Sequence, residues 1–356
     1  MNLLEPLQLG TLTLPNRVIM APLTRCRAID ERVPNALMAE YYRQRSGAGL
    51  IISEGAVVDP LGVGYPGTPG LWNSRQVEGW RLVTGAVHQA GGRIFAQLWH
   101  VGRVSDPHYL DGRQPVAPSA VAHQGHVSLL RPERPYPVPR ALELEEISAV
   151  VEAFARGAEN AREAGFDGVE LHGANGYLID QFLQASSNRR EDEYGGSIEN
   201  RARFMLEVTD AVCAVWGPER VGMHLAPRGA EDPDADPTGE KVFTHVAGEL
   251  GRRGLAFICA REPRRDGWLG PSLKAAFGGV YIANQEFTGE SARQVIAAGE
   301  ADAVAFGRSF IANPDLPRRL AEDLPLNRPD PATFYGDGAQ GYTDYPFAPQ
   351  EGSGGQ

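Results

Sequence analysis

Residues 144–172 read LEEISAVVEAFARGAENAREAGFDGVELH and join one helical pattern to one strand pattern. Apolar residues recur at helical spacing from Leu144 to Ala164, and Gly165 is typical of the left-handed residue that ends a helix. The run from Gly168 to His172 is short and bounded by glycine, as buried strands are. A helix that leads directly into a strand indicates a parallel βα repeat.

The same alternation extends along the whole chain. Eight strand patterns occur, at Val18 to Ala21, Leu50 to Ser53, Ile94 to Trp99, Gly168 to His172, Val221 to Ala226, Leu255 to Cys259, Val280 to Ala283 and Ala303 to Gly307. Helical patterns occupy Asn35 to Ser46, Arg75 to Ala90, Leu144 to Ala164, Ile198 to Trp216, Lys241 to Arg252, Ser291 to Ala298 and Pro314 to Glu322, with a weak one at Pro271 to Phe277. Eight such units close a barrel, so we predict an α/β fold, a single (β/α)8 TIM barrel.

One connection is much longer than the others. The stretch from Ser105 to Arg140 holds seven prolines and lies between the third strand and the third helix. Loops that follow barrel strands form the active face, so we predict an elaborated loop that covers the site rather than a linker between two domains. Residues 1–349 would then form one barrel, and the Gly/Ser-rich residues 350–356 a flexible tail.

Composition narrows the class of partner. The 356 residues are 42% hydrophobic and carry a formal net charge of -11, which disfavours a nucleic-acid surface. No apolar run reaches the roughly 18 residues of a membrane span, and no secretion signal opens the chain. Cys26, Cys213 and Cys259 are too scattered for disulfides or a zinc pair. We expect a cytoplasmic monomer or homodimer with a small-molecule substrate, no membrane or nucleic-acid partner and no metal.

Polar residues gather where the predicted strands end. Thr24, Gln97, His172, Asn175, His224 and Arg308 all follow or end such strands. In a helical turn His172 and Asn175 would point the same way and could donate to one substrate oxygen that gains negative charge. Tyr177 could then supply a proton.

A phosphate pocket is indicated after the eighth strand. Ala305-Phe306-Gly307-Arg308 ends a strand in glycine and follows it with a cation. Barrels commonly bind phosphate at the loops after strands seven and eight.

Taken together, these motifs resemble the Old Yellow Enzyme family of flavin-dependent ene-reductases over nearly the whole chain. The matching motifs are Ala21-Pro22-Leu23-Thr24-Arg25, Met38-Ala39-Glu40-Tyr41-Tyr42, Gly64-Tyr65, Gln97-Leu98-Trp99-His100, Glu170-Leu171-His172, Gly176-Tyr177-Leu178, Gln181-Phe182-Leu183, Tyr194-Gly195-Gly196-Ser197-Ile198-Glu199-Asn200-Arg201, Phe306-Gly307-Arg308, Ile311-Ala312-Asn313-Pro314 and Gly341-Tyr342-Thr343-Asp344-Tyr345-Pro346.

The resemblance implies a noncovalent FMN that passes hydride from NADPH or NADH to the Cβ of an activated alkene. It implies that Tyr177 protonates Cα and that His172 and Asn175 hold the substrate oxygen. The remaining implied roles are flavin-ring contacts for Pro22, Thr24, Gly55 and Gln97, phosphate contacts for Gly307 and Arg308, and substrate-pocket positions for Tyr65, Trp99 and Tyr335.

Two positions depart from the family pattern. His224 stands where relatives usually carry an arginine near flavin N1, and a histidine is cationic only part of the time at neutral pH. The flavin potential should therefore fall unless His224 stays protonated or Arg228 replaces the missing cation. Gln285 stands where relatives usually carry glycine near the phosphate, which predicts weaker FMN binding, with Glu286 pointing to solvent.

Two other functions stay open at this point. A phosphate-binding lyase or isomerase would want a Schiff-base lysine or paired carboxylates at strand ends, yet Lys241 and Lys274, the only lysines, lie in predicted helices. A flavin-binding protein with little turnover is compatible with His224 and Gln285. Cys26, close to Thr24, reads as a small buried residue.

Overall fold

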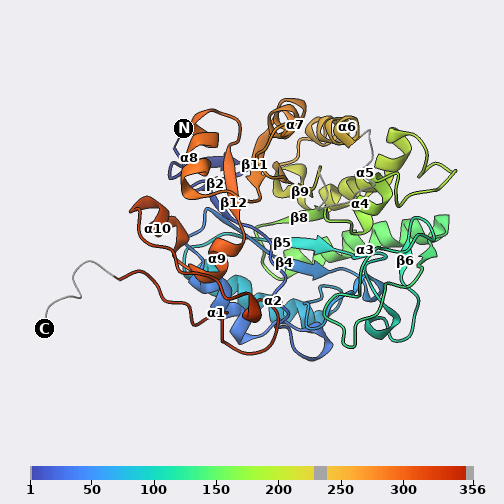
Figure 1. Ribbon diagram of the computed structural model, residues 1–356, viewed down its shortest axis with the longest axis horizontal. Coiled ribbons are helices and arrows are strands. Elements are labelled where there is room, and N and C mark those ends of the chain that lie inside the picture. Colours follow the sequence, from blue (N-terminus) through green and yellow to red (C-terminus); the bar gives the residue numbers. More distant parts are fainter. Residues whose placement is uncertain (1, 228–238, 350–356) are drawn as a thin grey trace, which may run out of the picture.

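The computed structural model describes residues 2–227 and 239–349, and its centre is a closed barrel of eight parallel strands (Figure 1). Neighbouring strands in the barrel follow chain order, and the last pairs with the first. The strands are β3 (Val18–Met20), β4 (Leu50–Val57), β5 (Ile94–Trp99), β8 (Gly168–Gly173), β9 (Val221–Leu225), β10 (Phe257–Arg261), β11 (Val280–Asn284) and β12 (Ala303–Phe306). The predicted (β/α)8 barrel is confirmed.

Two strands differ from the sequence prediction in a way that matters for the site. β10 begins two residues later than predicted and ends at Arg261, because Ala256 still bonds backward to Pro218 and Val221 before the ladder starts. β4 continues past Ser53 to Val57 through a register shift between Ile52 and Gly55. The extension of β4 places Gly55 opposite Gln97 of β5, and the extension of β10 adds Arg261.

Helices surround the barrel (Figure 1). They are α1 (Ala36–Gln44), α2 (Ser74–Gln89), α3 (Leu144–Glu163), α4 (Leu178–Leu183), α5 (Ile198–Trp216), α6 (Gly239–Arg252), α7 (Gly270–Phe277), α8 (Gly289–Ala297), α9 (Arg308–Ala312) and α10 (Leu316–Ala321). The weakly periodic sixth helix exists as α7. Pro314 to Glu322 was expected as one helix, but α10 begins only at Leu316, and α4 and α9 were not predicted at all.

An N-terminal hairpin that the sequence analysis missed lies against the barrel interior. Strands β1 (Leu7–Leu9) and β2 (Leu12–Leu14) pair in antiparallel fashion. The side chains of Leu7, Leu9 and Leu14 join one buried cluster with inward residues of the barrel strands, including Ile19, Leu50, Phe95, Phe257 and Ile282. This apolar cluster fills the amino-terminal part of the barrel, so polar residues are confined to the other end.

The Pro-rich stretch after β5 is an elaborated loop, as predicted. It contains the short paired strands β6 (Val116–Ala117) and β7 (Arg140–Ala141). Its apolar side chains pack in one cluster with Trp99 at the end of β5, and the loop members of that cluster are Leu110, Val127, Leu130 and Tyr136. The loop thus covers the carboxyl-terminal end of the barrel.

None of the helices in the described ranges has the length and apolar character needed to span a membrane. The predicted flexible tail, residues 350–356, lies outside the described residues, as does Arg228.

Candidate active site

Inward-facing polar side chains gather at the carboxyl-terminal end of the barrel. Side chains alternate along a strand, so every second residue of β5, β8, β9 and β10 faces the interior. His172 of β8 lies opposite His224 of β9, and His224 lies opposite Cys259 of β10. Gln97 of β5 lies opposite Glu170 of β8. The predicted residues Gln97, His172 and His224 therefore belong to one connected group.

Three aromatic side chains, Tyr65, Trp99 and Tyr177, pack together beside this polar group. The Trp99 ring stacks with Tyr65 at a centroid separation of 5.5 Å and meets Tyr177 edge-on at 5.0 Å. His172 lies 4.9 Å from Tyr177 and 5.9 Å from His224 between ring centroids. The tertiary structure thus brings together residues that are up to 159 positions apart in the chain, from Tyr65 to His224, as the sequence analysis expected.

Tyr177 and Tyr65 share a hydrogen bond between their hydroxyl groups at 2.8 Å, and either oxygen can be the donor. Burial, followed by the neighbouring Tyr65, raises the pKa of Tyr177 well above its usual value. Burial also raises the pKa of Tyr65 to about 12, while the Tyr177 hydrogen bond opposes that rise. Tyr177 therefore stays protonated at neutral and moderately alkaline pH and retains a proton to donate.

The turn that carries Asn175 differs from the helical turn expected from the sequence. β8 ends at Gly173, and Asn175 and Gly176 both adopt left-handed backbone angles, with φ of 61° and 75°. Asparagine tolerates this region better than most residues, and glycine enters it freely. The chain therefore turns sharply before α4, and Asn175 stays at the barrel mouth instead of extending a helix.

His172 is buried and close to positive charge. Burial, then His224 and Arg261, lower the pKa of His172 well below its usual value. A neutral imidazole has one nitrogen that donates and one that accepts. The Nδ1 atom of His172 has no hydrogen-bond partner among the described residues, which leaves this ring able to serve a ligand.

Arg261 is a site residue that the sequence analysis missed. Its Nη1 atom donates a 2.7 Å hydrogen bond to Oδ1 of Asn175. The strand prediction ended at Cys259, so it assigned Arg261 to a loop; the observed β10 instead ends with Arg261 at the barrel mouth.

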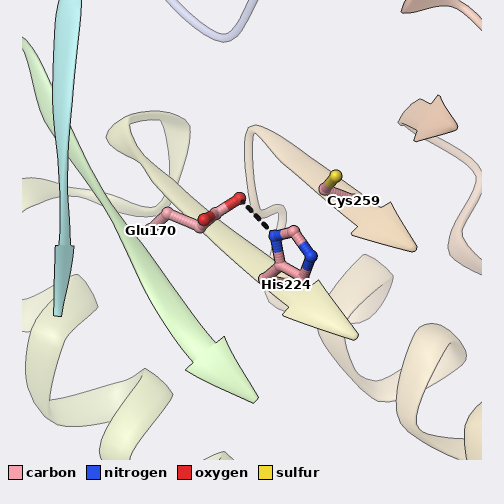
Figure 2. A group of neighbouring side chains, drawn as sticks. All are labelled: Glu170, His224 and Cys259. Carbon is pink, nitrogen blue, oxygen red and sulfur yellow. Dashed lines mark ion pairs between the residues drawn. The ribbon is translucent and has the colours of Figure 1, made fainter. Parts of the chain in front are cut away.

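A group of three buried side chains on β8, β9 and β10 was also not anticipated (Figure 2). The Glu170 carboxylate points toward the His224 ring, with Oε1 3.4 Å from Nδ1, and Cys259 stands on the neighbouring strand. The potential ligand atoms of these three residues all lie within 4.8 Å of one another. Glu170 also accepts a 2.8 Å hydrogen bond from Nε2 of Gln97. The Glu170 carboxyl group therefore links Gln97 with His224, the two residues that the resemblance places beside the flavin pyrimidine.

The expected phosphate end lies after β12. Arg308 begins α9 and is exposed, and it forms no hydrogen bond or ion pair with any described residue. A Cβ atom added to Gly307 would meet only Leu23, at 3.3 Å, so the backbone at Gly307 is open. Arg308 is therefore available to an anionic ligand.

The other residues that were predicted to contact the flavin or the substrate differ in their burial and in their surroundings. Pro22 and Thr24 are half-buried in the segment after β3. Gly55 is required by packing as well as by any ligand, because a Cβ there would lie 2.5 Å from the Trp99 ring. Tyr335 is 49% exposed and interacts electrostatically with Tyr65 and Arg308, which places it at the rim of the site. Cys26 is buried, as expected.

Gln285 and Glu286 occupy a strained turn after β11. Their φ angles are 91° and 61°, in the region that favours glycine. This backbone geometry would favour glycine at position 285. Glu286 points outward as expected and pairs with Arg265 at 2.9 Å.

Replacing Gln285 with glycine should therefore stabilise the protein. Holding a non-glycine residue in this conformation costs about 1–2 kcal/mol, part of which the greater chain entropy of unfolded glycine offsets. We expect Gln285→Gly to raise the free energy of unfolding by about 1 kcal/mol, measured by urea denaturation. Gln285→Ala is the control, because alanine relieves no strain; equal gains in both variants would contradict this explanation.

The chemistry of these residues fits FMN. The Thr24 hydroxyl and Gln97 amide can bond the polar edge of an isoalloxazine ring, and the Arg308 guanidinium can bind a phosphate. No carboxylate within the described ranges competes for Arg308.

Comparison with known proteins agrees with this interpretation. Residues 2–327 match the model of the NADH:flavin oxidoreductase / NADH oxidase family. A probable flavin mononucleotide-dependent alkene reductase of Leishmania infantum is 45% identical over 357 residues, covering 97% of each chain. 12-Oxophytodienoate reductase 2 of Arabidopsis thaliana is 42% identical over 359 residues, covering 97% of this chain and 95% of its own.

Solved structures agree as well. Morphinone reductase in complex with tetrahydroNAD superimposes with a TM-score of 0.93 at 50% identity, covering 98% of both chains. The Old Yellow Enzyme homologue of Zymomonas mobilis gives a TM-score of 0.94 at 45% identity, covering 97% of this chain and 99% of its own.

Fold, site and relatives define an FMN-dependent oxidoreductase on a (β/α)8 barrel. The chain belongs to the NADH:flavin oxidoreductase / NADH oxidase family, and its resemblance to the Old Yellow Enzyme family is confirmed.

Proposed function

We propose that this ene-reductase reduces enones, maleimides and nitroalkenes, with His172 and Asn175 holding the substrate oxygen and Tyr177 protonating Cα. Bound FMN supplies the hydride, which it receives from a nicotinamide cofactor. The observation that carries the proposal is the half-buried Tyr177, whose hydroxyl group shares a hydrogen bond with Tyr65 and whose ring lies beside His172 and Trp99.

Each residue then has a defined task. Donors from His172 and Asn175 stabilise the negative charge that develops on the substrate oxygen. Tyr177 transfers its proton to Cα, and Tyr65 stabilises the resulting phenolate through the existing hydrogen bond. The loop from Ser105 to Arg140 keeps water away from this side of the pocket by packing over Trp99.

The alternatives lose support for separate reasons. Family membership decides against a lyase or isomerase, and Lys274 is tied to Asp302 and the Gly299 carbonyl, away from the barrel mouth. A flavin-binding protein without turnover has the same fold and the same cofactor, so only a kinetic experiment separates it from an enzyme.

That experiment is an anaerobic titration of the purified protein. We expect a yellow protein with one noncovalent FMN per chain, bleached by NADPH and reoxidised by cyclohexenone, a maleimide or a nitroalkene. If NADPH bleached the flavin but none of the alkenes reoxidised it, the ene-reductase proposal would be contradicted. Parallel titrations with NADPH and NADH test the further proposal that NADPH is preferred. The cytoplasmic location and the monomeric or homodimeric state stay predictions.

Arg308→Ala should weaken FMN retention. A charge-assisted phosphate contact is worth about 1.5–3 kcal/mol, so the dissociation constant of FMN should rise by about 10- to 100-fold. Dialysis followed by fluorescence titration with FMN measures this change. Arg156→Ala, which removes an exposed arginine on α3, is the control. Unchanged FMN affinity in Arg308→Ala would exclude the proposed phosphate contact.

A further inference from the structure

Arg261 brings a guanidinium group to the barrel mouth at the end of β10. It is half-buried, and within residues 2–227 and 239–349 its only hydrogen bond is the one that Nη1 donates to Oδ1 of Asn175. No carboxylate in those ranges pairs with it. Its charge also reaches His172, whose pKa it helps to lower. Arg261 therefore interacts with both residues of the proposed substrate-oxygen site.

The chemistry of this contact fixes the orientation of the Asn175 amide. A guanidinium group has only donors, whereas the asparagine amide has an accepting Oδ1 and a donating Nδ2. Only Oδ1 can face Arg261, because the reversed amide would set N–H groups against each other. Nδ2 with its two N–H groups is therefore directed away from Arg261.

The backbone at this point makes such control necessary. Asn175 and Gly176 both have positive φ in a short turn, which sets the position of the amide but not which end of it faces the pocket. A side-chain partner must therefore fix the orientation of the Asn175 amide. Arg261 can reach Asn175 because β10 extends to residue 261.

We propose that Arg261 is the positioning residue of the substrate-oxygen site: it holds Oδ1 of Asn175 so that the Nδ2 group donates to the substrate oxygen. Its charge polarises the amide and strengthens this donor as negative charge develops on the oxygen. The proposal rests on the proposed function, in which Asn175 binds that oxygen. It implies a preference for ligands whose oxygen carries negative charge, such as phenolates.

Equilibrium binding of para-methoxyphenol to the oxidised, FMN-loaded full chain tests the proposal without turnover. The change in flavin absorbance on titration gives the dissociation constant. We expect Arg261→Met to raise it by about 10-fold, the effect of losing one oriented, charge-assisted donor. In an Asn175→Ala background the same substitution should change it by less than about 2-fold, since coupled residues are not additive.

Arg261→Lys keeps the positive charge and a hydrogen-bond donor group. We expect this variant to bind the phenol more tightly than Arg261→Met and nearly as tightly as the parent. This result would separate the positioning role from a general packing role. Arg264→Met is the matched control, because Arg264 lies three residues after Arg261 but pairs with Glu300. The dissociation constant of this variant should equal that of the parent.

Three results would overturn the inference. Unchanged phenol binding in Arg261→Met would remove the positioning role. A 10-fold loss that persists in the Asn175→Ala background would show direct ligand contact by Arg261 instead. If Asn175→Ala alone leaves phenol binding unchanged, the proposed oxygen site itself is wrong, and the failure lies in the proposed function.

Discussion

Tyr177→Phe should slow alkene reduction by about 100- to 10,000-fold, the range typical of a lost general acid, while flavin reduction by the nicotinamide stays nearly intact. The proton is needed only in the oxidative half-reaction, which explains the split between the two. Stopped-flow measurement of each half-reaction for an enone gives both rates directly.

The size of the effect of Tyr177→Phe should depend on the kind of alkene. A nitroalkene yields a nitronate that is stable enough to be protonated later in solution, so Tyr177→Phe should affect nitroalkenes much less than enones. Tyr65→Phe is the matched control: it removes the 2.8 Å hydrogen bond to Tyr177 but leaves the acid in place, and it should cost about 10-fold. Equal slowing of both half-reactions in Tyr177→Phe would mean that the phenol is structural.

The pH dependence follows from the environment of Tyr177. Burial and Tyr65 raise its pKa, so the protonated donor persists to higher pH than an exposed tyrosine would allow. The oxidative half-reaction of the parent should therefore show no alkaline loss due to Tyr177 between about pH 6 and 9.

His224→Arg should raise the flavin potential, with the largest gain at alkaline pH, where a histidine is neutral and an arginine is not. A unit charge at about 4 Å and an effective dielectric near 20 contributes about 4 kcal/mol, or roughly 85 mV for a two-electron couple. The Glu170 carboxyl group lies 3.4 Å from His224 and is placed to pair with the new guanidinium, and such an ion pair would offset part of this gain. We therefore treat roughly 85 mV as the upper end of the expected shift.

Reduction should also take up a proton at His224, because added negative charge on the flavin favours the imidazolium. The parent potential should then fall more steeply with pH than that of His224→Arg. Spectroelectrochemical titration of both proteins from about pH 6 to 9 measures slope and offset together. Parallel curves without an offset would show that His224 does not sense the flavin. Glu170→Gln in each background then reports how much the buried carboxyl group contributes to the potential.

Much of the architecture could be predicted from local patterns. The alternation of short strands and helices predicted the barrel, and Gly165, which was expected to end a helix in the left-handed conformation, has a positive φ of 83°. Helix α5 was predicted at its exact bounds. What local patterns missed was short or interrupted: the β1–β2 hairpin, α4 and α9, where too few residues repeat for a period to be recognised.

The sequence by itself determined the closed barrel, the elaborated loop and the family, because periodicity, prolines and ordered motifs are properties of neighbouring residues. Only the tertiary structure decided which side chains meet: Tyr65 with Tyr177, Glu170 with His224, and Arg261 with Asn175. These contacts depend on strand register and on where each strand ends. A two-residue shift in β10 was enough to move Arg261 from an expected loop to the barrel mouth.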